Sequence, residues 1–343
     1  MSCLTLQASD AEETITWGQK AIVLADRLGD TDALAHALNT IGTIELGHGD
    51  MAGKDKLERC LELALSGGEL RCVAMAFGNL CSALSRLGRY RDMAPYAEEG
   101  IAYCEEHGLD AWTQWLVSAN AEIQLALGLW DQAAETATSI IDAPASPKTR
   151  VHWALLVRAL VRARRGDPDH RTPLERAQAI GESVGDLQWL AADAAAAAEC
   201  AWLEGRQAEI GPATQASFEL ALLQPAFIGL LGLWRWRAGL LGEPAAEAGE
   251  PYSYQIAGDW ARAASYWREN GCRYEAALAL ADSRDGKALR QALDELQALG
   301  ARPAAAIVAR RLRELGERGL PRGARPETRA NPAGLSRLGL LGP

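Results

Sequence analysis

The pentapeptide Gly-Glu-Ser-Val-Gly at residues 181–185 has the spacing of a hydrolase nucleophile, G-x-S-x-G. In that motif a strand leads into the serine, and an acid and a histidine follow later in the chain. No histidine follows His170 in this sequence, and Ser183 stands at the end of a helical segment. Because Gly185 suits the position just past a helix C-terminus, we expect Ser183 to lie at a helix end and not to act as a nucleophile.

Residues 47–55, Gly-His-Gly-Asp-Met-Ala-Gly-Lys-Asp, come close to a phosphate-binding loop. That loop reads G-x-x-x-x-G-K-[ST], follows a strand and offers a hydroxyl group to magnesium. Here five residues separate Gly47 from Gly53, and Asp55 stands where the hydroxyl group is needed. Helical segments flank the stretch on both sides. We interpret it as a turn between helices, so no nucleotide site is predicted there.

Metal ligands and paired acids are scattered along the chain. The five histidines have no i, i+4 partner, and no two of the seven cysteines have C-x-x-C spacing. Adjacent glutamates such as Glu98 and Glu99 diverge by about 100° on a helix, so they are expected to be solvated and not to form an acid–base pair. The sequence therefore predicts no metal site, no cofactor and no catalytic centre, and we expect a protein that is not an enzyme.

The composition is that of a helical, acidic chain of 343 residues. Apolar residues make up 48% and charged residues 23%, which is ordinary for a globular protein. Alanine and leucine outnumber the β-branched residues, and this favours helices over strands. The formal charge of −10 disfavours nonspecific binding to a phosphate backbone, so we expect no direct DNA binding by this chain.

The chain carries no recognisable export signal or membrane span. Its first residues include neither a basic region nor an apolar run. The longest apolar stretch, residues 220–234, is interrupted by Gln224 and Pro225 and is shorter than the ~20 residues that cross a bilayer. The cysteines are odd in number and widely spaced, so they are predicted to be reduced and mostly buried. We expect a cytoplasmic protein.

Glycines recur at steps of 19 or 20 residues, with one step of 38 that contains Pro144 and Pro147. The series consists of Gly29, Gly49, Gly68, Gly88, Gly108, Gly128, Gly166, Gly185 and Gly205. A glycine just past a helix C-terminus adopts the left-handed conformation at little cost, and the intervals between these glycines are amphipathic. The spacing predicts a string of helices of about four turns joined by short loops, so neighbouring helices must run antiparallel.

Every second glycine from Gly49 to Gly205 has a small residue seven positions earlier. These small residues are Gly42, Cys81, Ala121, Ala159 and Ala198. Seven residues are two helical turns, so a small side chain there lets the partner helix approach closely. With the pattern G-x-[YW]-x-x-A at residues 128–133 and 258–263, the chain resembles the tetratricopeptide repeat, at a longer period of about 39 residues. The implied fold class is all-α, a right-handed α-solenoid of antiparallel helix pairs.

Composition divides the chain into four parts. Residues 1–241 form the predicted tetratricopeptide-like repeat array. Residues 242–251 hold two prolines and no helical period, so we expect a loop or hinge. Residues 252–315 are predicted to be C-terminal helical repeats. Residues 316–343 are rich in glycine, proline and arginine, which is typical of a flexible basic tail.

In tetratricopeptide-like arrays the first helix of each pair lines the concave surface. The resemblance assigns this role to residues 33–47, 71–86, 110–126, 148–164 and 188–203. Polar or aromatic residues on these helices that a core does not require are candidates for a binding groove. They are His36, Asn39, Asn79, Arg86, Trp112, Gln114, Asn120 and Arg158. We expect a protein, a peptide or a small-molecule inducer in this concave groove.

Two further sets of side chains admit two interpretations each. Arg158, Arg162 and Arg165 share one helix face, which is either a solvated surface near a helix C-terminus or a contact for an anionic partner. Most of the eleven tryptophans fall at helical spacing. They are predicted to pack between helices, with one or two of them lining the groove.

Several strings of the sequence, the most specific of them near the C-terminus, resemble those of one family. They are QIAGDW, GCRYEAALALAD, LGARPAA and RGARPETRANPAGLS, and LADRLGD, LAHALNTIGT and EEGIAYCEE precede them. These strings resemble the helical repeat region of large ATP-binding transcriptional regulators of the LuxR type. In that family an ATPase domain precedes the repeats and a helix-turn-helix follows them. This chain has no Walker motif, and it departs from the family pattern at about Ser336.

The resemblance implies a non-catalytic module that binds a ligand or protein and couples the signal within a LuxR-type regulator. The chain is then truncated, without its own DNA-binding domain, and binding changes the superhelical pitch. An autonomous tetratricopeptide-like scaffold for protein–protein interaction is the alternative. An enzyme whose residues converge from several repeats is a third interpretation.

The first helix carries Ile15, Trp17 and Ile22, some of which a preceding repeat would normally cover. Solenoids need capping repeats with polar outer faces. We therefore expect self-association through this uncapped N-terminal helix.

Overall fold

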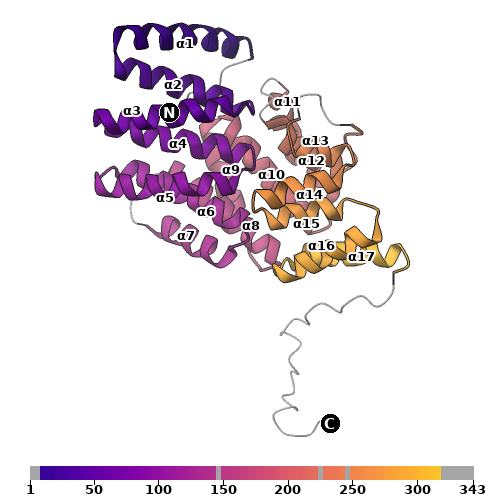
Figure 1. Cartoon of the computed structure of the whole chain (residues 1–343). Helices are drawn as coiled ribbons and strands as arrows, with labels where there is room; N and C mark the ends of the chain where they lie inside the picture. The colour runs from indigo at the N-terminus through magenta and orange to yellow at the C-terminus, as the bar shows by residue number, and fades with distance from the viewer. Residues whose placement is uncertain (1–7, 144–147, 223–226, 244–247, 318–343) are drawn as a thin grey trace.

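The structure, a computed structural model, describes residues 8–143, 148–222, 227–243 and 248–317. Within these residues every regular element is helical: seventeen α-helices and one 3-10 turn, Gln207–Glu209 (Figure 1). The predicted all-α class is confirmed. The predicted tail beyond residue 317, Cys3 and the turn at residues 144–147 lie outside the described residues.

The helices follow one another as antiparallel neighbours with short turns. After α1 (Ala8–Leu28), the first helices of successive pairs are α2 (Thr31–Gly47), α4 (Leu70–Arg86), α6 (Asp110–Ala126), α8 (Lys148–Arg165) and α10 (Leu187–Leu203). The second helices are α3 (Ala52–Gly67), α5 (Tyr90–Glu106), α7 (Trp130–Asp142), α9 (Arg171–Val184) and α11 (Ile210–Ala221). The five predicted first helices are confirmed to within two residues at each end.

The regular glycines end helices as predicted. All nine have a positive φ, between 65° and 88°. At Gly88, for example, the chain leaves α4 with the amide of Gly88 donating to the carbonyl of Ser85 at 2.9 Å and the amide of Arg89 donating to that of Leu84 at 2.9 Å. These bonds satisfy carbonyls that the helix end would leave free.

Small residues allow paired helices to touch at their backbones. A Cβ atom added at Gly42 of α2 would lie 2.7 Å from the carbonyl oxygen of Gly53 on α3. The corresponding small residues of the later pairs, Cys81, Ala121, Ala159 and Ala198, are fully buried. The predicted role of the small residue, close approach of the partner helix, is confirmed at Gly42.

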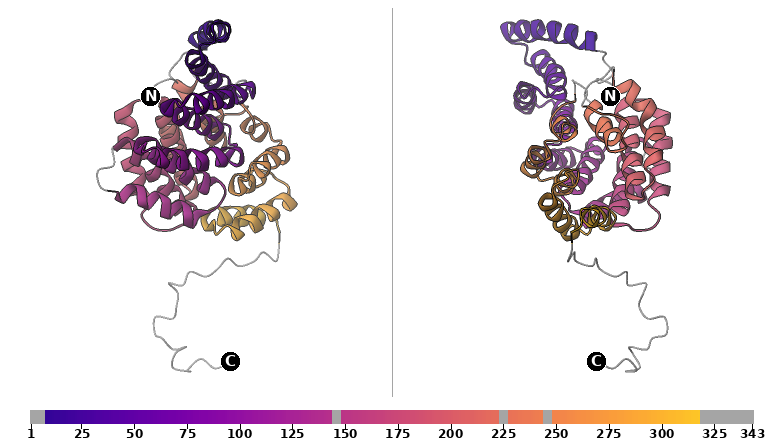
Figure 2. Two further views of the ribbon diagram at one scale, coloured as in Figure 1. Left: turned by 60° about the vertical axis from the view of Figure 1, so that its left-hand side comes forward. Right: turned by 90° about the vertical axis from the view of Figure 1, so that its right-hand side faces the viewer.

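After α11 the chain turns back across the array. The returning helices are α12 (Ile228–Arg237), α13 (Tyr252–Ile256), α14 (Trp260–Glu269), α15 (Arg273–Ala281), α16 (Gly286–Ala298) and α17 (Arg302–Glu314). Figures 1 and 2 show α14–α17, in orange to yellow, lying beside the array helices α4–α8. The predicted solenoid therefore curls back upon itself, which the sequence did not indicate.

The seam of this closure joins α14–α17 to the turns after α4, α6 and α8. A Cβ atom at Gly88 would lie 2.5 Å from the ring of Trp267, and one at Gly128 would lie 2.9 Å from Leu299. At the last contact, Arg302 donates to the carboxylate of Asp167 at 2.6 Å. The turn glycines thus end helices and also leave room for the returning chain.

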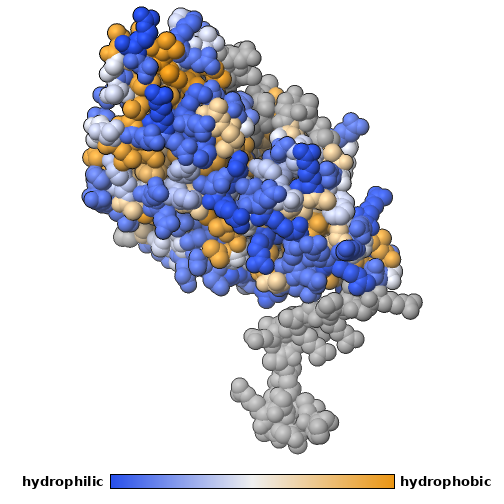
Figure 3. Space-filling view, in the orientation of Figure 1, coloured by the Kyte–Doolittle hydropathy of each residue, from blue (hydrophilic) through white to orange (hydrophobic). Residues whose placement is uncertain are grey.

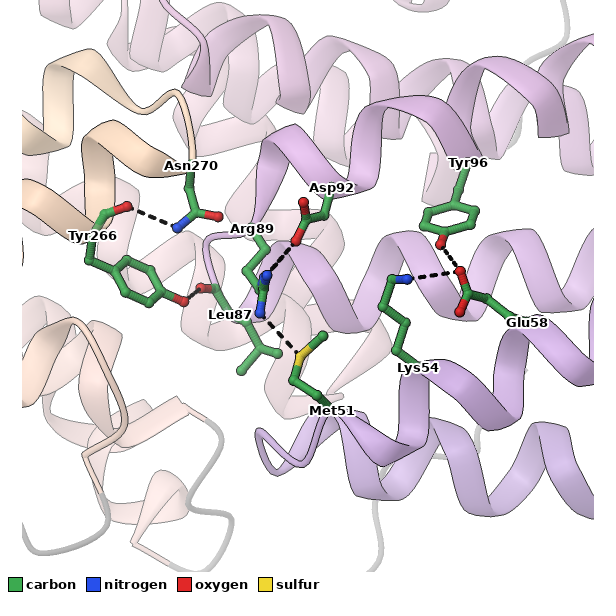
Figure 4. A network of polar contacts seen from close by, with 9 residues as sticks. All are labelled: Met51, Lys54, Glu58, Leu87, Arg89, Asp92, Tyr96, Tyr266 and Asn270. Atoms are coloured by element: carbon green, nitrogen blue, oxygen red, sulfur yellow. Dashed lines mark hydrogen bonds and ion pairs between the residues drawn. The ribbon is translucent and has the colours of Figure 1, made fainter.

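Hydrogen bonds reinforce the seam where α14 meets the turn after α4 (Figure 4). The hydroxyl group of Tyr266 donates to the carbonyl of Leu87 at 2.7 Å. Beside it, Arg89 donates to Asp92 at 2.7 Å and to the sulfur of Met51 at 3.2 Å. Because Tyr266 and Leu87 are 179 residues apart, this bond exists only in the closed arrangement.

Two hydrophobic clusters follow from this path. The smaller cluster extends from Ala25 to Ile123 and belongs to α1–α6. The larger one extends from Ala121 to Leu312, so the returning helices share a core with α6–α10. This larger cluster includes residues on both sides of the predicted hinge at 242–251.

The N-terminal end of the array has nothing packed on its outer face among the described residues. Trp17 is 61% exposed and Leu28 is 72% exposed, and Val23 and Leu24 lie between them. Figure 3 shows apolar surface over α1 and α2 at this end. Self-association through this end stays a prediction.

Two smaller predictions concern the cysteines and the apolar stretch at residues 220–234. The six described cysteines are free thiols and all are buried, as predicted. Burial raises the pKa of Cys81 and of Cys200 to about 12, so these thiols are protonated at neutral pH. The apolar stretch is divided between α11 and α12, and no described helix has the length and apolar character needed to cross a membrane.

Candidate functional site

An interior cavity lies between the concave side of the array and the returning helices. It has two lobes of about 190 and 140 Å³. Together they reach the lower end of the size range of small-molecule sites, ~300–1,000 Å³. The lobes adjoin, because the same six side chains bound both of them. These are Tyr90, Glu122, Trp153, Ala192, Leu230 and Tyr252.

One wall of the cavity is a stripe along three first helices of the array. Its residues recur at helical spacing, so on each helix they share one face. They are Trp115, Ser118 and Glu122 on α6, Trp153, Leu160 and Arg164 on α8, and Ala192 and Glu199 on α10. Trp115 and Trp153 contribute large rings to the smaller lobe, whereas Ala192 on α10 contributes only a methyl group.

The opposite wall comes from the returning helices. It consists of Leu230, Trp234 and Arg237 on α12, Tyr252 and Gln255 on α13, Trp267 on α14, and Glu275 and Leu278 on α15. The cavity therefore exists only because the chain folds back upon the array. Most of the lining is apolar, with a few polar groups among the rings, which is the usual character of a small-molecule site.

The smaller lobe holds one arginine and one carboxyl group. The guanidinium of Arg86 donates to the hydroxyl group of Ser82 at 3.1 Å, and burial lowers the pKa of Arg86 to about 10. Glu122 accepts from Ser85 at 2.5 Å and from Tyr90 at 3.0 Å. Burial raises the pKa of Glu122 above its ordinary value, while the hydrogen bonds from Ser85 and Tyr90 partly offset this effect.

The larger lobe is lined by charged side chains that form ion pairs, so that their charges neutralise one another. Arg164 donates to both oxygens of Glu199, at 2.7 and 3.1 Å, and lies 3.1 Å from Glu275. Burial alone would lower the pKa of Arg164, but Glu199 and Glu275 raise it above its ordinary value. The guanidinium also stacks on the ring of Tyr274, with 4.1 Å between its carbon and the ring centroid.

A second arginine of the larger lobe is paired in the same way. Arg237 lies 2.9 Å from Asp282, and both side chains are buried. The amide of Gln255 also donates to Asp282, at 2.5 Å. These contacts tie α12, α13 and the end of α15 together, so this wall is held by charge-assisted hydrogen bonds as well as by apolar packing.

A buried histidine–carboxylate pair lies outside the cavity lining. His152 on α8 and Asp193 on α10 are 2.8 Å apart. Trp153 and Trp189 flank the imidazole, with centroids 5.0 and 4.5 Å from it. Ser183 is exposed and donates to the carbonyl of Ile180 at 2.7 Å, at the end of α9, so it does not bond to this histidine. The predicted position of Ser183 at a helix end is confirmed.

Within the described part of the chain, no three His, Cys, Asp or Glu side chains are placed to hold a metal ion together. The string at residues 47–55 forms the turn from α2 to α3, as predicted, with Asp50 accepting from the amide of Ala52 at 2.9 Å. What the cavity offers is binding by apolar contact and a few hydrogen bonds.

Of the eight predicted groove residues, Arg86 alone is among the cavity-lining residues. Asn39 and Asn79 meet instead across α2 and α4, where the amide of Asn79 donates to Asn39 at 3.0 Å. Trp112 packs against Gly78 of α4, where an added Cβ atom would lie 3.1 Å from its ring. His36 is exposed and belongs to an open groove between α1 and α2.

The remaining predicted groove residues lie on α6 and α8. Gln114 and Asn120 are half-buried on α6 and do not line either lobe. Arg158 on α8 donates to the hydroxyl group of Thr138 at 3.2 Å. Arg162 and Arg165 are paired with Asp169 and Asp131, so part of this basic face is neutralised within the chain.

Sequence reasoning missed most of the cavity-lining residues, although the repeat contains a signal for some of them. The residue directly after each small residue of the repeat faces the cavity from α4 onward. These residues are Ser82, Glu122, Leu160 and Glu199. Glu122 and Glu199 occupy equivalent positions of the repeat, so the 39-residue register could have identified them. The residues on α12–α15 had no such signal.

No protein-family model matches the chain, and no curated protein matches it in sequence.

Proposed function

We propose that the chain is a non-catalytic module that binds a small, mostly apolar molecule in its interior cavity. The observation that carries the proposal is the composition of the walls. Rings from the array, such as Trp153, and from the returning helices, such as Trp267, enclose one space with few polar groups. Such a space favours a ligand that is apolar over most of its surface and makes one or two hydrogen bonds.

Binding in this cavity would favour the closed arrangement of the chain. A ligand in contact with both walls has its full set of contacts only while the seam is formed. It therefore stabilises the closed state in proportion to its preference for that state. The position of α17, and of the chain that follows it, would then depend on the ligand. This is a means of coupling ligand binding to a C-terminal output.

The further proposal, that this coupling serves a regulator of the LuxR type, rests on the sequence strings. QIAGDW contributes Gln255, and GCRYEAALALAD contributes Glu275 and Leu278, to the cavity wall. The strings that suggest the family are therefore part of the proposed site. In this proposal the module acts within a regulator whose ATPase and helix-turn-helix parts lie outside this chain.

The first experiment tests the cavity with prodan, a neutral naphthalene dye whose emission shifts in apolar surroundings. We expect saturable binding at one site per chain. Ala192 lines both lobes, so Ala192→Phe should fill their junction and abolish binding. Ala257→Phe is the matched control, because Ala257 is exposed at the end of α13. Equal binding by both variants would refute the cavity as the site.

The second experiment tests the coupling by amide hydrogen exchange with and without prodan. We expect slower exchange in α14 and α17, whose contacts form the seam, and no change in α1. Slower exchange confined to α6, α8 and α10 would mean that the ligand binds but does not stabilise closure. If prodan does not bind and a peptide instead protects the outer helices, the scaffold interpretation takes its place.

A further inference from the structure

The three arginines that line the cavity differ in how their charge is balanced. Arg164 has Glu199 and Glu275 as partners, and Arg237 has Asp282. Arg86 has no Asp or Glu oxygen at ion-pair distance among the described residues. Within the described part of the chain it forms one hydrogen bond, to Ser82, and its Nη2 atom is buried without a partner there. An unpaired buried guanidinium is costly, because its charge has lost water and gained no counter-charge.

The charged groups nearest to Arg86 do not replace a counter-ion. Asp186 and Glu122 act on it at a distance and partly offset the effect of burial on its pKa. Asp186 is engaged in capping α10, where it accepts from the amide of Gln188 at 2.8 Å. Glu122 is engaged by Ser85 and Tyr90, and its own burial disfavours its ionised form. Arg86 remains protonated at neutral pH, because its pKa stays near 10.

The surroundings of Arg86 are otherwise suited to an apolar body. Trp115, Met93 and Phe227 line the same lobe. Beyond Tyr252 the lobe continues into the larger one, where Trp153 and Leu278 lie. A molecule with one anionic end and an apolar chain or ring system would match this lining. Its anion would lie at the α4 end, beside Arg86, and its apolar part would extend into the larger lobe.

We propose that the ligand of the interior cavity carries a carboxylate that pairs with Arg86. The inference rests on the proposed function and specifies the chemical class of its ligand. A carboxylate offers two acceptor oxygens in the plane that a guanidinium fork requires, which makes it the natural partner of an unpaired arginine. The apolar remainder of the ligand lies along the rings of the two lobes.

The experiment compares two ligands that differ in one group, decanoate and decanol, by isothermal titration calorimetry at neutral pH. A charge-assisted hydrogen bond is worth ~1.5–3 kcal/mol, so decanoate should bind the wild-type chain about tenfold to hundredfold more tightly than decanol. In Arg86→Met this ratio should fall to about one, with decanol affinity kept. Arg158→Met is the matched control, because Arg158 lies on α8 away from the lining, and it should keep the wild-type ratio.

Two further variants separate recognition from folding. Arg86→Lys keeps the charge but loses the planar fork, so it should give an intermediate ratio, and circular dichroism shows whether each variant is folded. Glu122→Gln removes a carboxyl group near Arg86, so it should raise the ratio of decanoate affinity to decanol affinity and not lower it. If Arg86 has a purely structural role, Arg86→Met should weaken the binding of decanoate and of decanol by the same factor.

The outcomes distinguish this proposal from the one on which it rests. If decanoate and decanol bind the wild type equally, and Ala192→Phe abolishes both, the cavity binds ligands but the carboxylate assignment is wrong. If decanoate binds more tightly but Ala192→Phe does not affect it, the anion is bound elsewhere and the assignment is equally wrong. If neither ligand nor prodan binds, the proposed function itself fails.

Discussion

The N-terminal helices α1–α3 and the returning helices α14–α17 are amphipathic helices of the same kind, yet their apolar side chains differ in how far they are covered. On α1, Trp17 and Leu28 are mostly exposed. On α14, Trp267 is 4% exposed, because it packs on the turn after α4 and lines the cavity. In a repeat array, therefore, the apolar period defines a face, whereas the path of the chain decides whether that face is covered.

Trp267 and Trp17 should differ most in what they contribute to stability. Trp267→Ala should lower the free energy of unfolding by about 3–5 kcal/mol, because it leaves a cavity in the core. Trp17→Ala should change it by no more than about 0.5 kcal/mol, since that ring is largely in solvent. Urea unfolding followed by circular dichroism measures both. Similar losses for the two variants would mean that the seam contributes little to stability.

Two turn glycines, Gly88 and Gly108, differ in the surroundings that a single added methyl group would meet. Gly88 and Gly108 have nearly the same φ, 66° and 65°, so alanine costs a similar ~1–2 kcal/mol of backbone strain at each. At Gly88 the new Cβ atom would also lie 2.5 Å from Trp267, whereas at Gly108 nothing lies within 4 Å. Gly88→Ala should therefore cost about 1–3 kcal/mol more than Gly108→Ala. In a Trp267→Ala background this excess should disappear, and a double-mutant cycle tests that directly.

The pH dependence of stability should have opposite signs at Glu122, on the cavity wall of α6, and at Glu58, on α3 of the N-terminal helices. Burial raises the pKa of Glu122, so the native state holds this proton more tightly than the unfolded chain, and its stability falls as pH rises through the ordinary glutamate pKa. Burial also acts to raise the pKa of Glu58 on α3, but hydrogen bonds from Lys54 and Tyr96 lower it overall (Figure 4). Ionised Glu58 therefore contributes to stability above the pKa of the unfolded state, and this contribution is lost as the pH falls through the lowered pKa of the native state.

Melting temperatures between about pH 4 and pH 7 measure this difference. Glu122→Gln should remove a decline toward neutral pH, and Glu58→Gln should remove a decline toward acid. If both variants change the pH dependence of the melting temperature in the same direction, the native state does not raise the pKa of Glu122 and lower that of Glu58.

The smallest effect on stability is expected at α1, where the readout is association. Trp17→Ser and Leu24→Ser should leave unfolding nearly unchanged and abolish the concentration-dependent sedimentation expected of the wild type. Leu315→Ser is the control, since Leu315 is 53% exposed at the other end of the described chain. A wild-type chain that sediments as a monomer at all concentrations contradicts the prediction.

The array could be predicted from sequence because its signals are local. Gly88 ends α4, and Gly42 lies against the backbone of its partner helix, for reasons that depend on residues within two turns. The seam could not be predicted, because nothing near Leu87 marks Tyr266 as its partner. The site shows the same division. Arg86 was found as a polar residue on a first helix, whereas Gln255 became part of a cavity only through the return of the chain.

The hydrogen bond from Tyr266 to Leu87 also has a consequence for biosynthesis. Its two residues leave the ribosome 179 positions apart, which at ~5–20 residues per second is a delay of about 10–40 s. Helices of the array form far faster than this, so the nascent chain first exists as an open solenoid with Trp115 and Trp153 uncovered. We expect closure to be the last folding event, and the open nascent chain to be the stage at which chaperones have most apolar surface to bind.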